Sequence, residues 1–403
     1  MRPLRVFELC TIAAIVAGSA SPALAQTPQP TRQAAIEQEQ AEKVKTLHPY
    51  VLTTGERLMN KVEDITVNGG LHWHPFFESA YRGAGFTLGA GYMHHVSPYN
   101  LLDVRASYSI LGYTRVEAEF IAPRLFQRRG ELSVLGGYRE ATQVAFYGLG
   151  IDSVKENRTN YLFKQPYLSG LMTLWPTRKL LMLRGGLEVT QWTQNPGEGS
   201  FPSIETRYQP DTLPGLGAEI NYLHSQGTVG FDWRPSRDYA RRGGLYAITL
   251  HDYRDNDETF GFRQVDYEVL QHFPILRETW AISLRGLVQT TSTKPGQRIP
   301  FYLLPSLGGG HNMRGYESYR FRDRNSLLLQ GEWRIMVNRF MDTAFFYDAG
   351  KVAPRLQDLD LNEMTHDYGF GVRFHSPIAT FFRVDLAKSP EGLRLVFASS
   401  APF

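Results

Sequence analysis

The chain has 403 residues, and its 43 Lys and Arg against 40 Asp and Glu give a formal net charge of only +3. This balance, without a basic block, argues against a nucleic-acid partner. The single cysteine, Cys10, cannot form a disulfide within the chain, and no Cys/His cluster suggests a metal, so we expect no cofactor.

The first 25 residues have the pattern of a secretory signal peptide. Arg2 and Arg5 precede an apolar run at 11–17, and Ala23-Leu24-Ala25 forms a small-x-small cleavage site. A retained membrane helix is the alternative, but the apolar run is too short to cross a bilayer. We therefore expect residues 1–25 to be removed, which leaves the mature chain without cysteine.

Residues 26–66 differ in composition from the rest. The stretch TRQAAIEQEQAEKVK is polar, poor in large apolar side chains and without a helical stripe. We expect a mobile periplasmic leader there, with at most a transient helix, followed by one domain at residues 67–403.

From about residue 84 the hydrophobic pattern has period two. In 325–337, Leu327, Leu329, Trp333, Ile335 and Val337 share one face, and Leu328, Gln330, Glu332 and Arg334 share the other. A soluble β-sandwich would alternate in the same way. Strands of roughly ten to twelve residues, aromatics near strand ends and the lack of helical segments favour a transmembrane antiparallel β-barrel.

The alternation predicts about 15 to 17 strands, and we expect 16 because bacterial barrels have even numbers. The candidates are 84–95, 101–111, 113–123, 131–144, 159–175, 179–192, 226–234, 243–254, 262–272, 279–292, 325–337, 341–351, 366–376, 379–388 and 392–402. Tight turns at 338–340 and 376–378 suit the periplasmic side. Long connections at 193–215, 293–324 and 352–365 would face outward.

One long connection stands out. The stretch LGGGHNMRGYESYRFRD at 307–323 places Arg314 on a glycine-rich loop, ahead of Glu332 on the next strand and Asp348 on the strand after that. If the loop folds into the barrel, the Arg314 guanidinium could pair with both carboxylates. Glycines would let the loop turn tightly and approach the wall: Gly308, Gly309, Gly310 and Gly315. The alternative is an Arg314 exposed to solvent on an outer loop.

This stretch, together with LLLQGEWRI, FFYDAGKV, YGFGVRFHSPIATFFRVDLA and the terminal LRLVFASSAPF, resembles the C-terminal barrel of the BamA/TamA superfamily, or bacterial surface antigen family. Weaker matches lie at FYGLGIDS (146–153) and DWRPSRDYARRGG (232–244). The resemblance implies a sixteen-stranded barrel whose Arg-Gly-aromatic loop tip enters the lumen and locks onto acids. Here the tip would be Arg314, Gly315 and Tyr316, and the acids Glu332 and Asp348.

The resemblance also implies a weak seam between the first and last strands. Pro402, next to the terminal Phe403, cannot donate a backbone hydrogen bond, which fits a frayed edge strand but equally fits simple chain termination. Family members that assemble proteins open this seam so that a client strand adds to the edge. Such members usually carry POTRA domains, which residues 26–66 cannot form, so we expect a member reduced to its barrel.

We therefore expect an insertion or translocation factor of the Gram-negative outer membrane. The alternative is a passive or gated pore whose long loop is a structural plug. No nucleophile elbow or Ser/His/Asp set indicates an enzyme, and His72, His74, His94, His95 and His311 are ordinary barrel histidines on this interpretation.

The expected partners follow from these alternatives. They are outer-membrane lipids, a protein, peptide or lipid client, and a separate periplasmic protein in place of POTRA domains. The terminal pattern Leu393, Leu395, Phe397 and Phe403 resembles the signal by which the outer-membrane assembly machinery recognises its own clients.

Overall fold

The computed structural model describes residues 32–46, 54, 57, 60–61, 72–177 and 180–403. The signal peptide expected at residues 1–25 lies outside these residues. The chain divides into two units, Met1–Thr54 and Gly55–Phe403, which are described separately.

The described part of the first unit is the helix α1, Arg32–Thr46. Its sequence is rich in Ala, Glu, Gln and Lys, which favour helix intrinsically, and an exposed pair joins Lys43 Nζ to Glu39 Oε1 at 2.8 Å. The sequence predicted at most a transient helix here, because the segment has no apolar stripe to pack. In the described parts of the chain, no helix is long and apolar enough to span a membrane.

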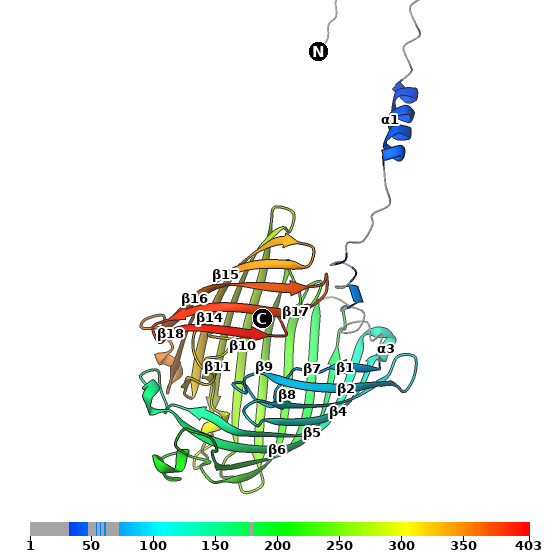
Figure 1. Ribbon diagram of the computed structural model, residues 1–403. Coiled ribbons are helices and arrows are strands. Elements are labelled where there is room, and N and C mark those ends of the chain that lie inside the picture. The colour runs from blue at the N-terminus through cyan, green and yellow to red at the C-terminus, as the bar shows by residue number, and fades with distance from the viewer. Residues whose placement is uncertain (1–31, 47–53, 55–56, 58–59, 62–71, 178–179) are drawn as a thin grey trace, which may run out of the picture. The chain divides into compact units, whose positions relative to one another are not determined.

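The second unit is dominated by one antiparallel sheet of sixteen strands, in which each strand pairs with its neighbours along the chain (Figure 1). Its strands are β1 (Trp73–Pro75), β2 (Thr87–His95), β3 (Leu101–Ser109), β4 (Thr114–Arg124), β5 (Gly130–Phe146), β6 (Thr159–Leu174), β7 (Leu181–Pro196), β8 (Glu219–Asp232), β9 (Gly243–Asp255), β10 (Phe262–Ile275), β11 (Trp280–Ser292), β14 (Asn325–Asn338), β15 (Met341–Ala353), β16 (Thr365–His375), β17 (Thr380–Ser389) and β18 (Gly392–Ala398).

Short elements occupy several connections. They are the helix α3 (Leu125–Arg128), the 3-10 turns η1 (Lys155–Asn157), η2 (Ile204–Thr206), η3 (Phe301–Leu303) and η4 (Leu356–Asp358), and the two-stranded sheet of β12 (Ser306–Leu307) and β13 (Phe321–Arg322). The all-β class and the antiparallel strands predicted from alternation are confirmed. The clearest boundary error is β8, which begins at Glu219 and not at residue 226. Neither β1 nor the β12–β13 pair was predicted.

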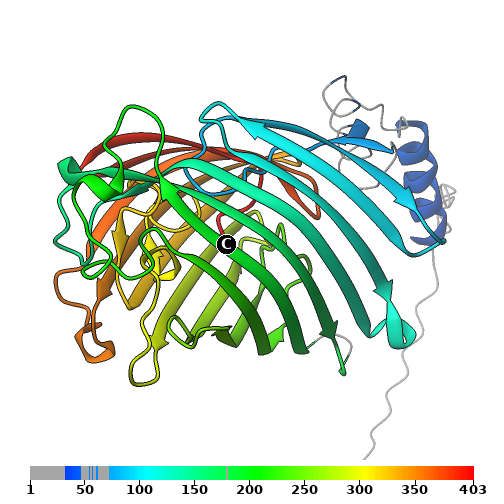
Figure 2. The same ribbon diagram turned by 90° about the horizontal axis from the view of Figure 1, so that it is seen from below.

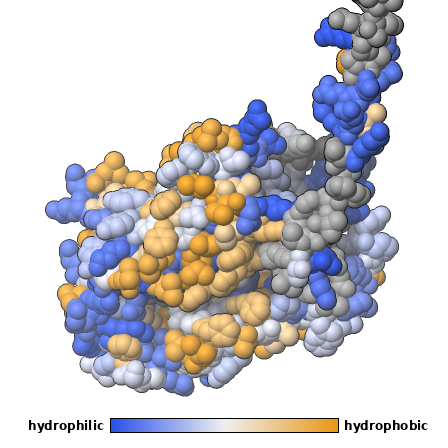
Figure 3. Space-filling view, turned by 45° about the horizontal axis from the view of Figure 1, so that its top comes forward, coloured by the Kyte–Doolittle hydropathy of each residue, from blue (hydrophilic) through white to orange (hydrophobic). Residues whose placement is uncertain are grey.

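The sheet curls (Figure 2), and the side chains on its two faces differ in chemistry. On β14 and β15 the outward-facing Trp333 and Tyr347 are 39% and 52% exposed, whereas the inward-facing Glu332 and Asp348 are 2% and 0% exposed. Figure 3 shows apolar side chains gathered across the middle of one outer face. Charges inside and apolar side chains outside suit strands surrounded by hydrocarbon, not a soluble sandwich.

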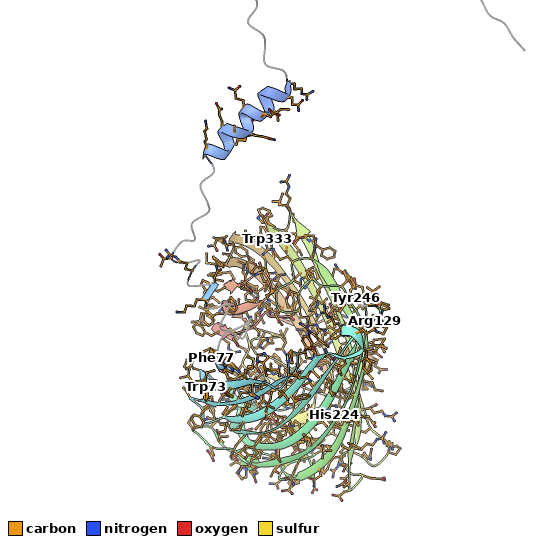
Figure 4. All side chains as sticks on the ribbon, turned by 90° about the vertical axis from the view of Figure 1, so that its right-hand side faces the viewer. Trp73, Phe77, Arg129, His224, Tyr246 and Trp333 are labelled. Atoms are coloured by element: carbon orange, nitrogen blue, oxygen red, sulfur yellow. The ribbon has the colours of Figure 1, made fainter. Side chains whose placement is uncertain are left out.

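The sheet has two unpaired edges. β1 pairs with only Ala90–Tyr92 of β2, and β18 pairs only with β17, so within the described residues no ladder joins β1 to β18. Figure 4 labels Trp73 and Phe77 at the first of these edges. The closed barrel expected from the sequence is therefore not closed by backbone hydrogen bonds here.

The first edge is short because the chain leaves it after Pro75. Residues 76–86, here called the inner segment, run along the inside of the sheet. The Tyr81 hydroxyl donates to Gln165 Oε1 on β6 at 2.5 Å, and Arg82 Nη2 donates to Ser306 Oγ at 3.0 Å. These side-chain contacts replace the strand pairing that a longer β1 would provide.

The last edge is also shorter than predicted, which corrects the assignment of Pro402 and Phe403 to the seam strand. β18 ends at Ala398, and Arg383 Nε donates to the Ser400 carbonyl at 2.9 Å. Pro402 is buried, and the Phe403 ring stacks on His272 of β10 with centroids 6.4 Å apart. Pro402 has no N–H to donate to a ladder, and the tail makes these interior contacts instead.

Candidate functional site

The candidate site is built on the long connection between β11 and β14. Antiparallel pairing of Ser306 with Arg322 and of Leu307 with Phe321 brings its ends together and leaves residues 308–320 as a loop tip. This tip lies on the inner side of the sheet, against β14 to β18.

Two of the predicted hinge glycines are required by the backbone. Gly308 and Gly309 have φ of +108° and +112°, and a Cβ at Gly308 would lie 2.1 Å from the Glu317 carbonyl oxygen. Gly310 serves differently, because a Cβ there would lie 2.9 Å from Val396 Cγ1 on β18. Glycine thus permits a tight turn at the first two positions and a close approach to the last strand at the third.

Arg314 is fully buried at the centre of the loop tip. Its Nε and Nη2 donate to the two Asp348 carboxylate oxygens at 2.7 and 2.8 Å, and Nη1 donates to Glu332 Oε2 at 2.7 Å. The guanidinium carbon also lies 3.5 Å from the centre of the Phe346 ring. The three residues singled out in the sequence are in direct contact, while their role as a lock stays a prediction.

The buried charge of Arg314 is compensated by the two carboxylates with which it pairs. Burial alone would lower the pKa of the Arg314 guanidinium, but the Asp348 and Glu332 carboxylates raise its pKa above the usual value, so the side chain is cationic. Asp348 accepts a bidentate pair of hydrogen bonds from Arg314, the geometry that planar guanidinium groups favour. A buried charge left without such partners would be strongly destabilising.

The ion pairs continue across the neighbouring strands. Arg373 on β16 donates to Glu332 at 2.7 Å and pairs with Asp385 on β17 at 2.7 Å. Arg383 also pairs with Asp385 and donates to the Gly310 carbonyl of the loop tip. Charges of alternating sign therefore connect the loop tip to β14, β15, β16 and β17.

Gly315 and Tyr316 fix the next part of the tip. A Cβ at Gly315 would lie 2.6 Å from Asp367 Cβ and 3.0 Å from Ser389 Cβ, and Ser389 Oγ donates to the Gly315 carbonyl at 2.9 Å. Tyr316 is buried, and its hydroxyl bonds to the Thr365 hydroxyl and donates to the His366 carbonyl at 3.2 Å. Glycine is thus needed for the loop to lie flat on β16 and β17.

Glu317 and Arg320 of the tip also contact the connection after β5, which was not predicted from the sequence. Glu317 accepts hydrogen bonds from the Tyr147 hydroxyl at 2.7 Å and from Arg158 at 2.9 Å. Arg320 donates to Glu391 at 2.6 Å and to the Ser153 carbonyl at 2.6 Å. The available signal was FYGLGIDS, which contains Tyr147 and Ser153. The loop tip therefore ties the C-terminal strands to the connection after β5.

Apolar side chains fill the same end of the interior. They come from β5, β6 and β8, from the inner segment and from the connections after β7 and β11, and include Ala80, Phe146, Phe163, Ile204, Leu216, Ile220, Phe301 and Tyr302. These buried side chains pack around the base of the loop and restrict the interior at the end where the long connections lie.

A second connection folds over the interior at the end of the sheet opposite the long connections. Residues 233–242, here called the floor segment, join β8 to β9 and reach the turn after β16, where Asp238 bridges to Ala379. The Tyr239 hydroxyl and Arg241 Nη1 both donate to Asp342 Oδ2, at 2.9 and 2.6 Å, and the Tyr239 ring stacks on His375. This cluster was not predicted, although it lies in the weak family match DWRPSRDYARRGG.

Comparisons with known proteins agree with this architecture. Residues 242–392 match the model of the Omp85 superfamily domain. Among solved structures, BamA from Haemophilus ducreyi lacking POTRA domains 1-3 aligns with a TM-score of 0.59 and 15% identity, over 81% of this chain and 68% of that chain. CdiB from Escherichia coli aligns with a TM-score of 0.53 and 11% identity, over 80% of this chain and 60% of that chain. A search of curated sequences gave no match.

The sheet and the domain match define an outer-membrane β-barrel protein of a Gram-negative bacterium. More specifically, residues 242–392 carry an Omp85 superfamily domain, and the fold is similar to that of the BamA barrel. The resemblance noted in the sequence and the predicted location are confirmed.

The buried ion pairs predict a large effect of losing the guanidinium. Arg314→Ala should lower the free energy of unfolding in lipid vesicles by about 3–5 kcal/mol, because it leaves the Asp348 carboxylate buried without its main partner. Arg254→Ala is the control, since Arg254 is 71% exposed and its ion pair with Asp252 is solvated. Urea titrations that give equal, small losses for both variants would rule out the cluster as a stabilising element.

The close approach of Gly315 predicts a local effect of a single methyl group. Gly315→Ala should lift the tip from β16 and β17, and limited proteolysis should then cut within 308–320. Gly170→Ala on β6 is the matched control, because a Cβ there meets nothing within 4 Å. Equal protease resistance of the two variants would contradict the packed position of the tip.

Proposed function

We propose that this chain is a protein insertion or translocation barrel whose working surface is the seam, meaning the gap between β18 and β1. The Omp85 domain match supports this class of function. The observation that carries the proposal is the free edge of β18, where the backbone of Gly392–Ala398 pairs on one side only. In a membrane, unpaired backbone groups are costly, so such an edge readily accepts an added strand.

The loop tip would act as the lock of this barrel. It is bonded to β14 and β15 through Arg314, approaches β18 at Gly310, and is bonded to the connection after β5 through Glu317. It thus contacts the C-terminal strands on one side of the seam and the connection after β5 on the other. Breaking its ion pairs would let the two edges of the sheet move relative to each other.

The filled interior favours this function over the alternative of an open pore. The loop tip and the apolar side chains occupy one end of the lumen, and the floor segment crosses the other. A pore would need both to move, whereas a seam works while the lumen stays blocked. We propose outer-membrane lipids, a protein, peptide or lipid client and a separate periplasmic protein as partners, and the assembly machinery as the partner in biogenesis.

Crosslinking across the seam tests the proposal. The chain expected after removal of residues 1–25 contains no cysteine, so cysteine pairs can be placed at will. Joining β18 to β2 with bifunctional maleimides of graded length should abolish client insertion into liposomes, because the client strand can no longer reach the edge. The control pair is Leu386→Cys with Leu395→Cys, which are register partners within β17–β18 and leave the edge free. Full activity of the seam-crosslinked barrel would refute the seam mechanism.

Conductance separates the proposed function from the pore. In planar bilayers the unaltered protein should be electrically silent. Deletion of 308–319 alone should open few channels, because the floor segment stays in place, and adding Tyr239→Ala with Arg241→Ala should open many. Steady conductance of the unaltered protein would favour the pore instead.

A further inference from the structure

A pocket of about 350 Å³ lies between the C-terminal hairpin and the N-terminal strands. Its walls come from the inner segment, the turn after β3, β5, the connection after β5, the loop tip and the start of β18. It therefore sits at the long-loop end of the seam. Its volume falls within the usual range for pockets that hold a small ligand group.

The charges of this pocket do not balance within the protein. Its walls carry four cationic side chains, Arg82, Lys155, Arg158 and Arg394, and two carboxylates, Glu317 and Glu391. Glu317 is paired with Arg158 at 2.9 Å, and Glu391 is paired through Oε1 with Arg320 at 2.6 Å, while Glu391 Oε2 has no hydrogen-bond partner within the described part of the chain.

Three cations are left over. Arg82 bonds only to the neutral Ser306 hydroxyl and lies over the Tyr319 ring at 4.6 Å, and no ion pair engages Lys155 or Arg394 among the described residues. The Nη1 of Arg394 is buried without a hydrogen-bond partner. Buried donors are usually satisfied, so Arg394 Nη1 has a donor available for a ligand in this pocket.

The backbone beside the pocket carries a second anomaly. Tyr319 has a φ of +61°, which is rare for a residue with a bulky side chain, and its ring lies between the guanidinium groups of Arg82 and Arg322. Such strain persists only where surrounding contacts impose it, and it concentrates at ligand sites. Here it holds the Arg82 guanidinium at the wall of the pocket.

One wall of the pocket borders the membrane-facing surface. Leu393 is among the lining residues and is 66% exposed on the outward face of β18, beside Leu395 and Phe397. An occupant would therefore meet cations inside and an apolar, membrane-facing strand outside. That combination fits an amphiphile, not a free soluble anion.

We propose that this pocket binds the phosphate-bearing headgroup of an outer-membrane lipid, with its acyl chains along the outward face of β18. Arg394 and Arg82 supply guanidinium donors for the phosphate oxygens, and Lys155 supplies a point charge. Because Gly315 and Ser318 line the same pocket, the bound lipid would touch the loop tip directly.

Native mass spectrometry in detergent tests the site with two matched lipids, bisphosphorylated lipid A and its dephosphorylated form. The unaltered protein should bind the phosphorylated lipid about tenfold more tightly, and Arg394→Gln should remove most of this preference. Lys155→Gln, at a partly exposed position that makes no side-chain bond, should weaken it several-fold without a risk to folding. Lys294→Gln on the exposed connection after β11 is the control and should change nothing.

Three outcomes would overturn the proposal. One is equal binding of the two lipids, and another is an equal effect of the Lys155 and Lys294 variants. The third is full competition by inorganic phosphate, or by a peptide with a free C-terminal carboxylate, at the same concentration as the lipid, which would assign the pocket to a soluble anion or to a client. The assay needs no insertion activity, so its failure would leave the proposed function standing.

Discussion

The buried guanidinium of Arg314 is the constraint on which the rest of the interior depends. A cation without exposed surface must be paired, and Arg314 is paired here because the loop tip lies against β14 and β15, where Asp348 and Glu332 stand on adjacent strands. Once the tip is in that place, Gly310 meets β18, Gly315 meets β16 and β17, and Glu317 reaches the connection after β5. One ion-pair cluster thus positions a loop that touches both sides of the seam.

The two faces of the sheet are stabilised by different interactions. Outward-facing aromatic and aliphatic side chains suit the hydrocarbon around the barrel, while ion pairs and packed loops hold the interior together. The weak point of this arrangement is the pair of edges, because the chain turns inward after Pro75 and again after Ala398. The edges are left unpaired beside the pocket that the unbalanced cations line, so strand addition and lipid binding would take place in the same region.

Much of this architecture could be predicted from the sequence, and the elements that were not predicted share a physical reason. Period-two alternation located the long strands, and the Arg314 cluster was predictable because its acids lie on the two strands that directly follow the loop. The inner segment, the floor segment and the inward C-terminal tail were missed. Their contacts, such as Tyr81 with Gln165 or Tyr239 with Asp342, join residues far apart in the sequence, and no local periodicity encodes them. Pro402 was assigned to the last strand because its missing N–H also fits a frayed edge.

A double-mutant cycle tests most directly whether the ion pair between Arg314 and Asp348 holds the loop tip in place. The free energy of unfolding in lipid vesicles would be measured for Arg314→Ala, Asp348→Ala and the double variant. The buried, two-pronged pair predicts a coupling energy of about 1–3 kcal/mol, with the double variant less destabilised than the sum of the single ones. Additivity within about 0.5 kcal/mol would mean that the two side chains do not hold the loop in the barrel.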